Sequence, residues 1–555
     1  MAASPKQHVD SDVEKEPIPG ISEEAIRNGS ITAGAVSERI LEHSHDADAA
    51  MKAFAELQGQ VLEIDEATNA RLLRKIDWHL MPVSTPGSAR PRLDPATGLA
   101  LTQLFVKLLC IVYGLNYLDK TTLSYASVMG LKKSQAEGGI GITSDQYSWL
   151  GSMFYFGYIA WEWPTNRLLQ YFPLGKYSAF NIIMWGTVLA LFATVEDFSG
   201  AVAVRFFLGL FEAAVTPGFA LFTSQWYTKK EQGLRTGIWF SFNGVAQIVG
   251  GLVAYGIARG TAAHGSSIDP WKIIFLVTGL LTVVVGIAFF FVMPDNQLNC
   301  RWLTQEERLL ALERIRVNQQ GIGNKHWKFY QVKEALSDPM VWAFFWYALI
   351  ADIPNGGITN FFSLLITSFG YTSEQSLLYG TPGGAVEIVT LIACGYLGDK
   401  YGSRLLVSTS GLLLGILGMA LIVGLPESMN VGRLIGYYLT QGTPTPFVAL
   451  LSLISTNVAG YTKKTTVAAM YLVGYCAGNI IGPQAFRGDS YLPAEITILV
   501  CYGVALLDVL FIYWYCKQQN KKKAAVRAAP GYVKLENQEW LDLTDKENPE
   551  FTYTL

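Results

Sequence analysis

The chain has 555 residues, of which 50% are hydrophobic, 13% aromatic and only 16% charged. Soluble proteins average about 25% charged residues, so this composition excludes an ordinary soluble protein. The net charge of −3 provides no basic excess for binding nucleic acid. We therefore expect a protein that resides in a lipid bilayer and has no nucleic-acid partner.

Apolar segments of about 20 residues, long enough to cross a bilayer core of about 30 Å as helices, follow one another along the chain. They cover residues 106–130, 146–170, 177–195, 198–222, 236–258, 271–293, 340–366, 375–398, 403–424, 433–459, 465–486 and 493–516. Six precede a polar segment and six follow it. The predicted fold class is an all-α membrane protein with twelve transmembrane helices in two six-helix bundles.

This pattern divides the chain into five parts. They are a polar cytoplasmic N-terminal tail (1–98), an N-terminal bundle (99–293), a cytoplasmic connector (294–339), a C-terminal bundle (340–516) and a cytoplasmic tail (517–555). Lys and Arg are more frequent in the short loops on the side of the termini and connector, which favours a cytoplasmic location for both termini. In the connector, Thr304 and Glu307 form the pattern of a capping box, which predicts an amphipathic helix beneath the bundles.

Ionisable side chains inside membrane spans are costly and therefore suggest function. The spans contain Lys120 and Arg205, the two basic residues placed well inside them, together with Asp119 and Glu212. Arg205 and Glu212 are two helical turns apart and share a helix face. We expect Lys120 and Arg205 to bind an anionic substrate and Asp119 and Glu212 to carry protons. The alternative is that these four groups form structural ion pairs.

Polar amides accompany these charges. Substrate contacts are predicted for Asn243, Gln247, Asn355 and Asn360, although amides also commonly join membrane helices to one another. The glycine pairs Gly250–Gly251 and Gly356–Gly357 are expected to let helices pack closely, and Pro354–Gly357 is the better candidate for a helix break that opens a binding cavity. Further acidic groups within the spans are Glu162, Asp352, Glu387 and Asp508.

Enzyme chemistry is not expected. All six histidines lie outside the predicted spans, and the one Gly-Lys dipeptide, at Gly175, is not part of a phosphate-binding loop. We expect no metal, no cofactor and no direct use of ATP. Movement of a solute must then depend on an ion gradient or on the gradient of the solute itself.

The loop after the eighth span carries a recognisable motif. Gly395, Leu397, Asp399, Gly402 and Arg404 resemble the G-x-L-x-D-x-x-G-x-R signature of the major facilitator superfamily. The resemblance implies that this motif acts in gating, with the glycines allowing close approach of helix ends and Asp399 acting as a latch. The corresponding stretch of the first half lacks the aspartate.

Further segments resemble one branch of that superfamily, the fungal allantoate permease-like members of the anion:cation symporter family. They are Leu118–Ala126, Arg205–Ala213, Trp226–Gln232, Asn355–Gly357 and Asp542–Asn548. The resemblance implies proton-coupled movement of small organic anions, such as allantoate-, ureidosuccinate-, nicotinate- or vitamin-like carboxylates, and sometimes dipeptides.

One stretch departs from the family pattern. The 24 residues from Ser84 to Lys107 separate Arg74–Asp77 from the first span, whereas the family runs almost directly into that span. They are either a tolerated cytoplasmic insertion or an intron retained in the deduced sequence, and we favour the intron.

Together these features predict a secondary transporter in the plasma membrane that works as a monomer and imports a small carboxylate with protons. An exporter of an acidic metabolite on the same scaffold remains the alternative. A non-transporting nutrient sensor is a further alternative, against which the short tail from Lys517 to Leu555 argues.

Overall fold

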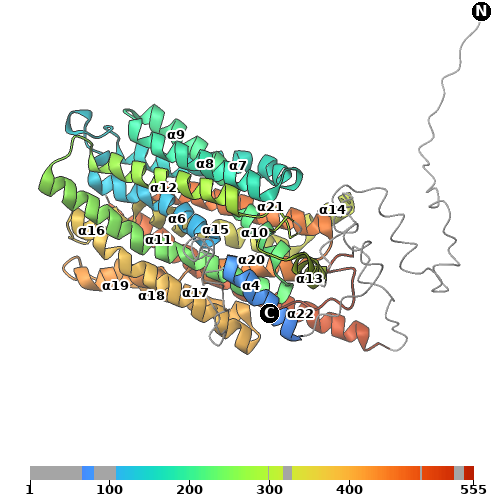
Figure 1. Cartoon of the computed structure of the whole chain (residues 1–555). Coiled ribbons are helices and arrows are strands. Elements are labelled where there is room, and N and C mark those ends of the chain that lie inside the picture. Colours follow the sequence, from blue (N-terminus) through green and yellow to red (C-terminus); the bar gives the residue numbers. More distant parts are fainter. Residues whose placement is uncertain (1–65, 81–107, 298, 317–327, 488–489, 530–542) are drawn as a thin grey trace, which may run out of the picture. The chain divides into compact units, whose positions relative to one another are not determined.

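The computed structural model describes residues 66–80, 108–297, 299–316, 328–487, 490–529 and 543–555 (Figure 1). All regular structure in these residues is helical. The 24-residue stretch from Ser84 to Lys107 and most of the N-terminal tail lie outside the described residues.

All six predicted spans of the first half are helical. They correspond to α6 (Leu108–Ala126) continued by η1 (Ser127–Leu131), α7 (Ser144–Tyr171), α8 (Leu174–Leu191), α9 (Phe198–Glu212) with α10 (Val215–Trp226), α11 (Lys229–His264) and α12 (Pro270–Val292). Short polar caps begin several of them. Thr143, for example, forms a capping box with Gln146 at the start of α7.

The six spans of the second half are helical as well. They correspond to α15 (Pro339–Ser368), α16 (Ser373–Tyr379) with α17 (Thr381–Tyr401), α18 (Arg404–Gly424), α19 (Asn430–Thr440) with α20 (Pro444–Asn457), α21 (Tyr461–Ile481) and α22 (Leu492–Arg527). The prediction of an all-α membrane fold is confirmed.

Nine helical segments of the described chain are long and apolar enough to cross a membrane by length and composition alone. The three remaining predicted spans are helical but fail that criterion. The helix α6 contains Asp119 and Lys120, α7 contains Glu162, and residues 433–459 are divided between the short helices α19 and α20. Polar residues within α6 and α7 and the break between α19 and α20 therefore explain why twelve spans are predicted but nine helices meet the criterion.

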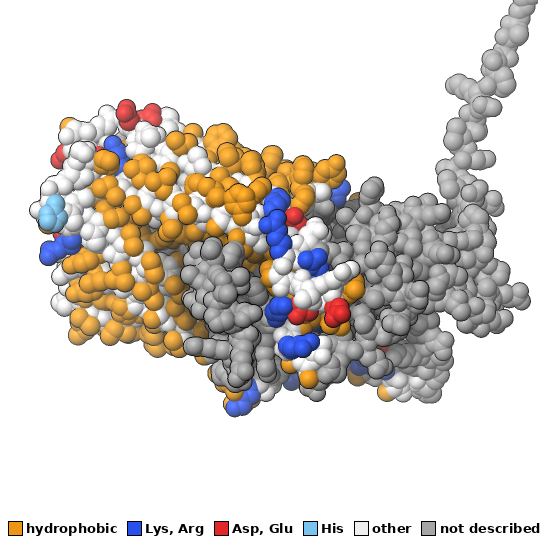
Figure 2. All heavy atoms as spheres, viewed as in Figure 1, with side chains coloured by type: hydrophobic (Ala, Val, Ile, Leu, Met, Phe, Trp, Pro, Cys, Tyr) orange, Lys and Arg blue, Asp and Glu red, His pale blue; other side chains and the backbone are white. Residues whose placement is uncertain are grey.

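The surface of the helices suits a lipid environment. Figure 2 shows hydrophobic side chains over much of the helical face in view. Large apolar residues are highly exposed, among them Val284 and Phe291 on α12 and Leu507 on α22. Water would not tolerate so many exposed apolar side chains, whereas hydrocarbon does. The protein is therefore a multi-pass membrane protein.

Within each half, glycines let helices approach closely. A Cβ atom at Gly157 of α7 would lie 1.9 Å from the backbone oxygen of Phe206, and one at Gly209 of α9 would lie 1.9 Å from that of Phe154. The helices α7 and α9 therefore touch backbone to backbone, as small residues allow in membrane proteins.

The two halves meet along α11 with α17 and α7 with α21. We call the end of the helices at which the connector lies the connector end, and the opposite end the far end. Hydrogen bonds between the halves gather toward the far end. The Tyr147 hydroxyl donates to the Asn360 backbone oxygen at 2.7 Å, and the Ser152 hydroxyl donates to that of Ile480 at 2.7 Å.

The predicted helix break at Pro354–Gly357 is wrong, because α15 runs through this segment from Pro339 to Ser368. Its glycines serve packing. A Cβ atom at Gly356 would lie 2.7 Å from the Cα atom of Asn479 on α21. The helices are interrupted at other places, between α9 and α10 and between α19 and α20.

Three short helices lie at the connector end. The helix α4 (Glu66–Leu80) forms part of the N-terminal tail, and α13 (Gln305–Arg316) and α14 (Phe329–Ser337) belong to the connector. Asp77 of α4 pairs with Arg235 at the start of the fifth span, at 2.8 Å. Part of the predicted N-terminal tail is therefore helical, which its polar composition did not reveal.

The predicted connector helix is present with its capping box, in which the Glu307 N–H donates to Thr304 Oγ1 at 3.3 Å. The deeply buried side chains of α13 are Ala311 and Arg314, while its other apolar residues are only half-buried: Leu309, Leu310, Leu312 and Ile315. Arg314 donates to Glu231 of α11. A charged contact therefore anchors this helix.

Candidate functional site

Four ionisable side chains predicted from the sequence come together between α6 and α9. Lys120 Nζ lies 2.9 Å from Glu212 Oε1, and Arg205 Nη1 lies 4.0 Å from Asp119 Oδ1. The side chains of Asp119 and Glu212 are fully buried and that of Arg205 is 2% exposed, whereas Lys120 keeps 13%. Each cation thus faces the acid of the other helix, and Lys120 is the most accessible of the four.

Neighbouring helices hold this charge cluster, defined as Asp119, Lys120, Arg205 and Glu212. The Trp185 indole of α8 donates to Asp119 Oδ2 at 2.5 Å. The Phe154 ring of α7 faces both cations, 5.7 Å from Lys120 Nζ and 5.2 Å from the Arg205 guanidinium carbon. Aromatic faces stabilise cations in dry surroundings, so they support charge inside the membrane.

The cluster is incompletely hydrogen-bonded. Arg205 Nε donates to the Leu150 backbone oxygen at 3.1 Å, but Arg205 Nη1 and Asp119 Oδ1 make no hydrogen bond among the described residues. Their separation of 4.0 Å is too long for one. Buried polar groups without partners are costly, so a ligand carboxylate that accepted a hydrogen bond from Arg205 Nη1 would be favoured here.

The predicted amide contacts divide into two sets. Gln247 Nε2 donates to the Gly380 oxygen at 3.0 Å and to the Tyr437 hydroxyl at 2.9 Å, which joins α11 to the second half. Asn360 donates to the Gly356 oxygen, and its own backbone oxygen accepts from Tyr147. Gln247 and Asn360 therefore take part in the far-end contacts between the halves.

The other two amides lie beside buried acids. Asn355 Nδ2 donates to Asn479 Oδ1 at 3.0 Å, one helical turn after Asp352. Asn243 lies next to Glu387. One carboxyl oxygen of Asp352 and one of Glu387 have no hydrogen-bond partner among the described residues. The second half thus contributes polar groups that the sequence identified only as acids within spans.

The predicted gating motif spans the end of α17 and the start of α18, at the connector end. Gly402 ends α17 with a φ of 64°, a left-handed conformation that favours glycine. A Cβ atom at Gly395 would meet nothing within 4 Å. The Asp399 side chain lies outside the described side chains. The Arg404 N–H donates to the backbone oxygen of Leu555 at 2.8 Å.

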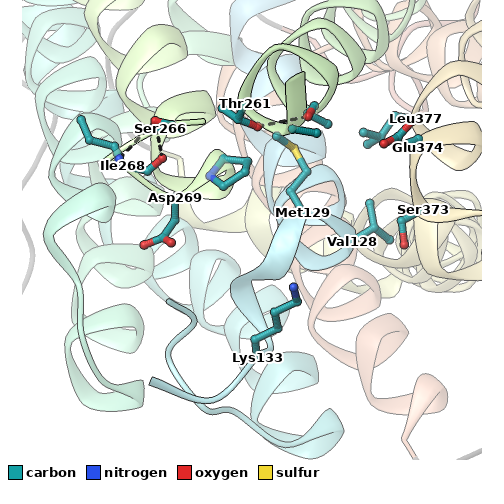
Figure 3. A pocket seen from close by; sticks show the side chains of 13 residues that line it. Val128, Met129, Lys133, Thr261, Ser266, Ile268, Asp269, Ser373, Glu374 and Leu377 are labelled. Atoms are coloured by element: carbon teal, nitrogen blue, oxygen red, sulfur yellow. Dashed lines mark hydrogen bonds between the residues drawn. The ribbon is translucent and has the colours of Figure 1, made fainter. Parts of the chain in front are cut away.

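A cavity of about 300 Å³ lies at the far end, apart from the charge cluster (Figure 3). Its lining includes Lys133, Asp269 and Glu374, and the predicted site residues are not among those that line it. Sequence reasoning missed Trp185 and Phe154 because neither aromatic residue carries a signal that distinguishes a charge-supporting contact from ordinary packing.

Comparison with known proteins decides the family. Residues 109–483 match the model of the Major Facilitator Superfamily. The chain belongs to the major facilitator superfamily. This facilitator is a secondary transporter rather than an enzyme, and its resemblance to the allantoate permease-like branch is confirmed by its relatives.

Two yeast relatives illustrate that branch. The facilitator is 39% identical to the "Uncharacterized transporter C417.10" of Schizosaccharomyces pombe, over 89% of this chain and 91% of the relative. It is 34% identical to the allantoate permease of Saccharomyces cerevisiae, over 100% of both chains.

Solved structures support the fold. The proton:xylose symporter XylE matches with a TM-score of 0.54 and 15% identity, over 74% of this chain and 94% of that one. A bacterial homologue of the lysosomal transporter Spinster, in an inward-facing conformation, matches with a TM-score of 0.51 and 14% identity, over 74% and 96%. At this identity the likeness concerns the fold alone.

Proposed function

We propose that this facilitator takes up a small organic anion together with protons. The observation that carries the proposal is the pairing of two buried cations with two buried acids, Lys120 with Glu212 and Arg205 with Asp119. A site made of cations alone would hold an anion tightly without responding to protons. Paired acids allow each cation to exchange its partner.

The exchange proceeds as follows. A substrate carboxylate binds Lys120 or Arg205 through charge-assisted hydrogen bonds. The acid that loses its cation is then a buried charge without a partner, which is costly, so it takes up a proton. Substrate and proton thereby bind to the same state of the protein, so neither is transported efficiently without the other.

Energetics require more than one proton. Moving an anion into a cell against an inside-negative potential costs about 2.3 kcal/mol per charge per 100 mV. Net inward movement of positive charge with a monovalent anion therefore needs at least two protons, and the cluster contains two acids. Asp119 and Glu212 are the proposed carriers.

Orientation and gating follow from the ends of the helices. With a basic excess on the connector side, the termini and connector are cytoplasmic, the far end faces outward, and the plasma membrane is the proposed location. The far-end contacts of Tyr147 and Ser152 then close the outer side, while the Gly395–Arg404 motif acts at the inner side. Alternating access moves one half against the other, and the facilitator is proposed to work as a monomer.

Asn243 of the first half and Asn355 of the second half would contact the non-ionic part of the substrate. Asn355 is half-buried, and the side-chain carbonyl oxygen of Asn243 has no hydrogen-bond partner in the part of the chain that the structure describes. Gln247 and Asn360 are proposed to act through the far-end contacts, which must open before substrate enters from outside. A carboxylate that also carries amide or ureido groups suits this combination, and the relative named allantoate permease agrees with that class.

The test is uptake in a yeast strain that lacks its own carriers. Labelled allantoate, ureidosuccinate, nicotinate, pantothenate and a dipeptide are compared at two external pH values, with and without a protonophore. We expect accumulation of at least one carboxylate, faster at acidic pH and abolished by the protonophore. Uptake that is indifferent to both conditions would refute proton symport and favour the exporter or an exchanger.

A further inference from the structure

The last twelve described residues form a docked element that the proposed transport cycle does not yet use. We call Thr544–Leu555 the closing segment. It contacts α14, the N-cap residue of α15, and the helices α20, α21 and α22, all in the second half or the connector. Thr544, Asp545 and Tyr553 are buried.

A buried ion cluster fixes the start of the closing segment. Lys463, in the first turn of α21, is fully buried, and its Nζ lies 2.8 Å from Asp545, 2.9 Å from Glu334 and 3.0 Å from Asp338. Removing one partner of such a cluster leaves another charge uncompensated in a dry site. The closing segment therefore supplies one of three acids that surround a single buried lysine.

A second buried contact orients Asp545. The Tyr553 hydroxyl donates to Asp545 Oδ2 at 2.7 Å. Burial, and then the charge of Asp545, raise the pKa of this hydroxyl above its ordinary value, which keeps the proton on the oxygen. Lys523 of α22 also donates to the Asp545 backbone oxygen.

The end of the closing segment is held by amides that pair with its backbone. Asn457 of α20 exchanges two hydrogen bonds with the Thr554 backbone, at 2.9 and 2.8 Å. Asn520 of α22 does the same with Tyr553, at 2.8 Å each. Amides that satisfy both backbone groups of a residue fix its position closely.

The closing segment also reaches the gating motif. The Leu555 backbone oxygen accepts the Arg404 N–H at 2.8 Å, at the first residue of α18. This contact connects the loop between α17 and α18 to the lysine cluster through one short segment. The connection runs within the second half, so it does not hinder movement between the halves.

We propose that the closing segment is a fixed brace that positions the Gly395–Arg404 gating loop on the second half, with Asp545 as its main positioning residue. The loop must reach the first half in the same place each time the inner side closes. Without the brace, the inward-closed state is populated less often, so turnover slows, and the apparent affinity for external substrate falls at most in proportion to the lost population of that state. This inference rests on membership of the facilitator family and not on the proposed substrate.

The first test is kinetic. Asp545→Asn leaves Lys463 paired with Glu334 and Asp338, and Lys546→Gln is the matched control, because Lys546 makes a more exposed ion pair with Asp338. The uptake test described above identifies a labelled compound that the wild type accumulates. Its uptake is then measured for the wild type and both variants, normalised to the amount of each protein at the cell surface. We expect Asp545→Asn to lower the maximal rate about 2- to 30-fold, the range for residues that couple two states, with any rise in KM no larger than the fall in the maximal rate. An unchanged maximal rate, or a change in KM alone, would overturn the proposal.

Deletion of residues 551–555 provides a second variant. It removes the contacts with Asn457, Asn520 and Arg404 but leaves the ion pair between Asp545 and Lys463. If the brace acts through the gating loop, this deletion lowers the maximal rate as Asp545→Asn does. A rate equal to that of the wild type would show that only the ion cluster matters and would refute the link to the loop.

A third test needs no substrate. Ser152 is buried at the far-end contact with Ile480, so a Ser152→Cys variant reports opening of that end when labelled by a membrane-impermeant maleimide from outside. Adding Asp545→Asn should slow the labelling severalfold, because outward opening requires inner closure. Equal labelling rates in both backgrounds would contradict the brace, even if none of the panel compounds were transported.

Discussion

Lys120 on α6 lies 2.9 Å from Glu212 on α9, while Asp119, its neighbour in sequence, faces Arg205. Two adjacent residues of one helix thus belong to two different ion pairs. The pairs share α6 and α9 and the ring of Phe154. Because the two pairs adjoin each other, all four members are substituted one at a time to distinguish the role of each pair.

Anion recognition is tested by Lys120→Gln and Arg205→Gln. We expect KM for an anionic substrate to rise about tenfold to a hundredfold, the loss associated with a hydrogen bond to a charged group. The neutral analogue, such as the methyl ester, should be affected much less. Initial uptake rates over a range of concentrations provide the measurement. If both substrates lose equally, the two cations serve structural ion pairs only.

Proton coupling is tested by Glu212→Gln and Asp119→Asn. Wild-type uptake should increase as the external pH falls from about 7 to about 5, since protons are co-substrates that neutralise the unpaired buried acids. Each variant should lose part of that pH dependence. Proton flux measured with a pH-sensitive dye in vesicles checks the same point. A variant with a full wild-type pH profile would exclude its acid as a carrier.

The gating motif is tested by Asp399→Asn. We expect transport to fall while surface abundance stays normal, because the charge acts in switching between states. Asp399→Glu, which keeps the charge, is the matched control. Normal turnover of Asp399→Asn at normal abundance would show that this charge only contributes to topology.

Backbone conformation at the same motif gives a separate prediction. Gly402→Ala should destabilise the loop by about 1–2 kcal/mol, because its φ of 64° is costly for a residue with a Cβ atom. Gly395→Ala should be tolerated, since nothing lies within 4 Å of its Cβ position. Thermal unfolding of the detergent-solubilised variants distinguishes the two. Equal unfolding temperatures would contradict a strained position 402.

Close packing of α7 on α9 should support the charge cluster. Gly209 lies between Arg205 and Glu212, and a Cβ atom there would lie 1.9 Å from the Phe154 backbone oxygen. Gly209→Ala should therefore cost at least about 1–3 kcal/mol of stability and raise KM by displacing Phe154. Gly237→Ala, where nothing lies within 4 Å, is the control in α11. A Gly209→Ala variant as stable and active as this control would refute the packing argument.

Much of the fold could be predicted from the sequence because the bilayer constrains it. Spans must be apolar and long enough to cross hydrocarbon, and ionisable residues within them are rare enough to stand out. Asp119, Lys120, Arg205 and Glu212 were therefore identifiable, and the structure brings all four together. The superfamily was recognisable from the Gly395–Arg404 motif, because its glycines and charged residues stand at a characteristic spacing.

Only the tertiary structure decided how these groups pair, because partner choice depends on where the fold places α6 relative to α9 and not on spacing along either helix. It also showed that α15 continues through Pro354, where Gly356 serves contact with α21. In the sequence, Asp545 belongs to a segment that carries the family resemblance, but nothing there indicates that it pairs with Lys463. The two residues form one buried ion pair because the closing segment folds back against α21, more than 80 residues earlier in the chain. No local sequence pattern encodes such a long-range contact.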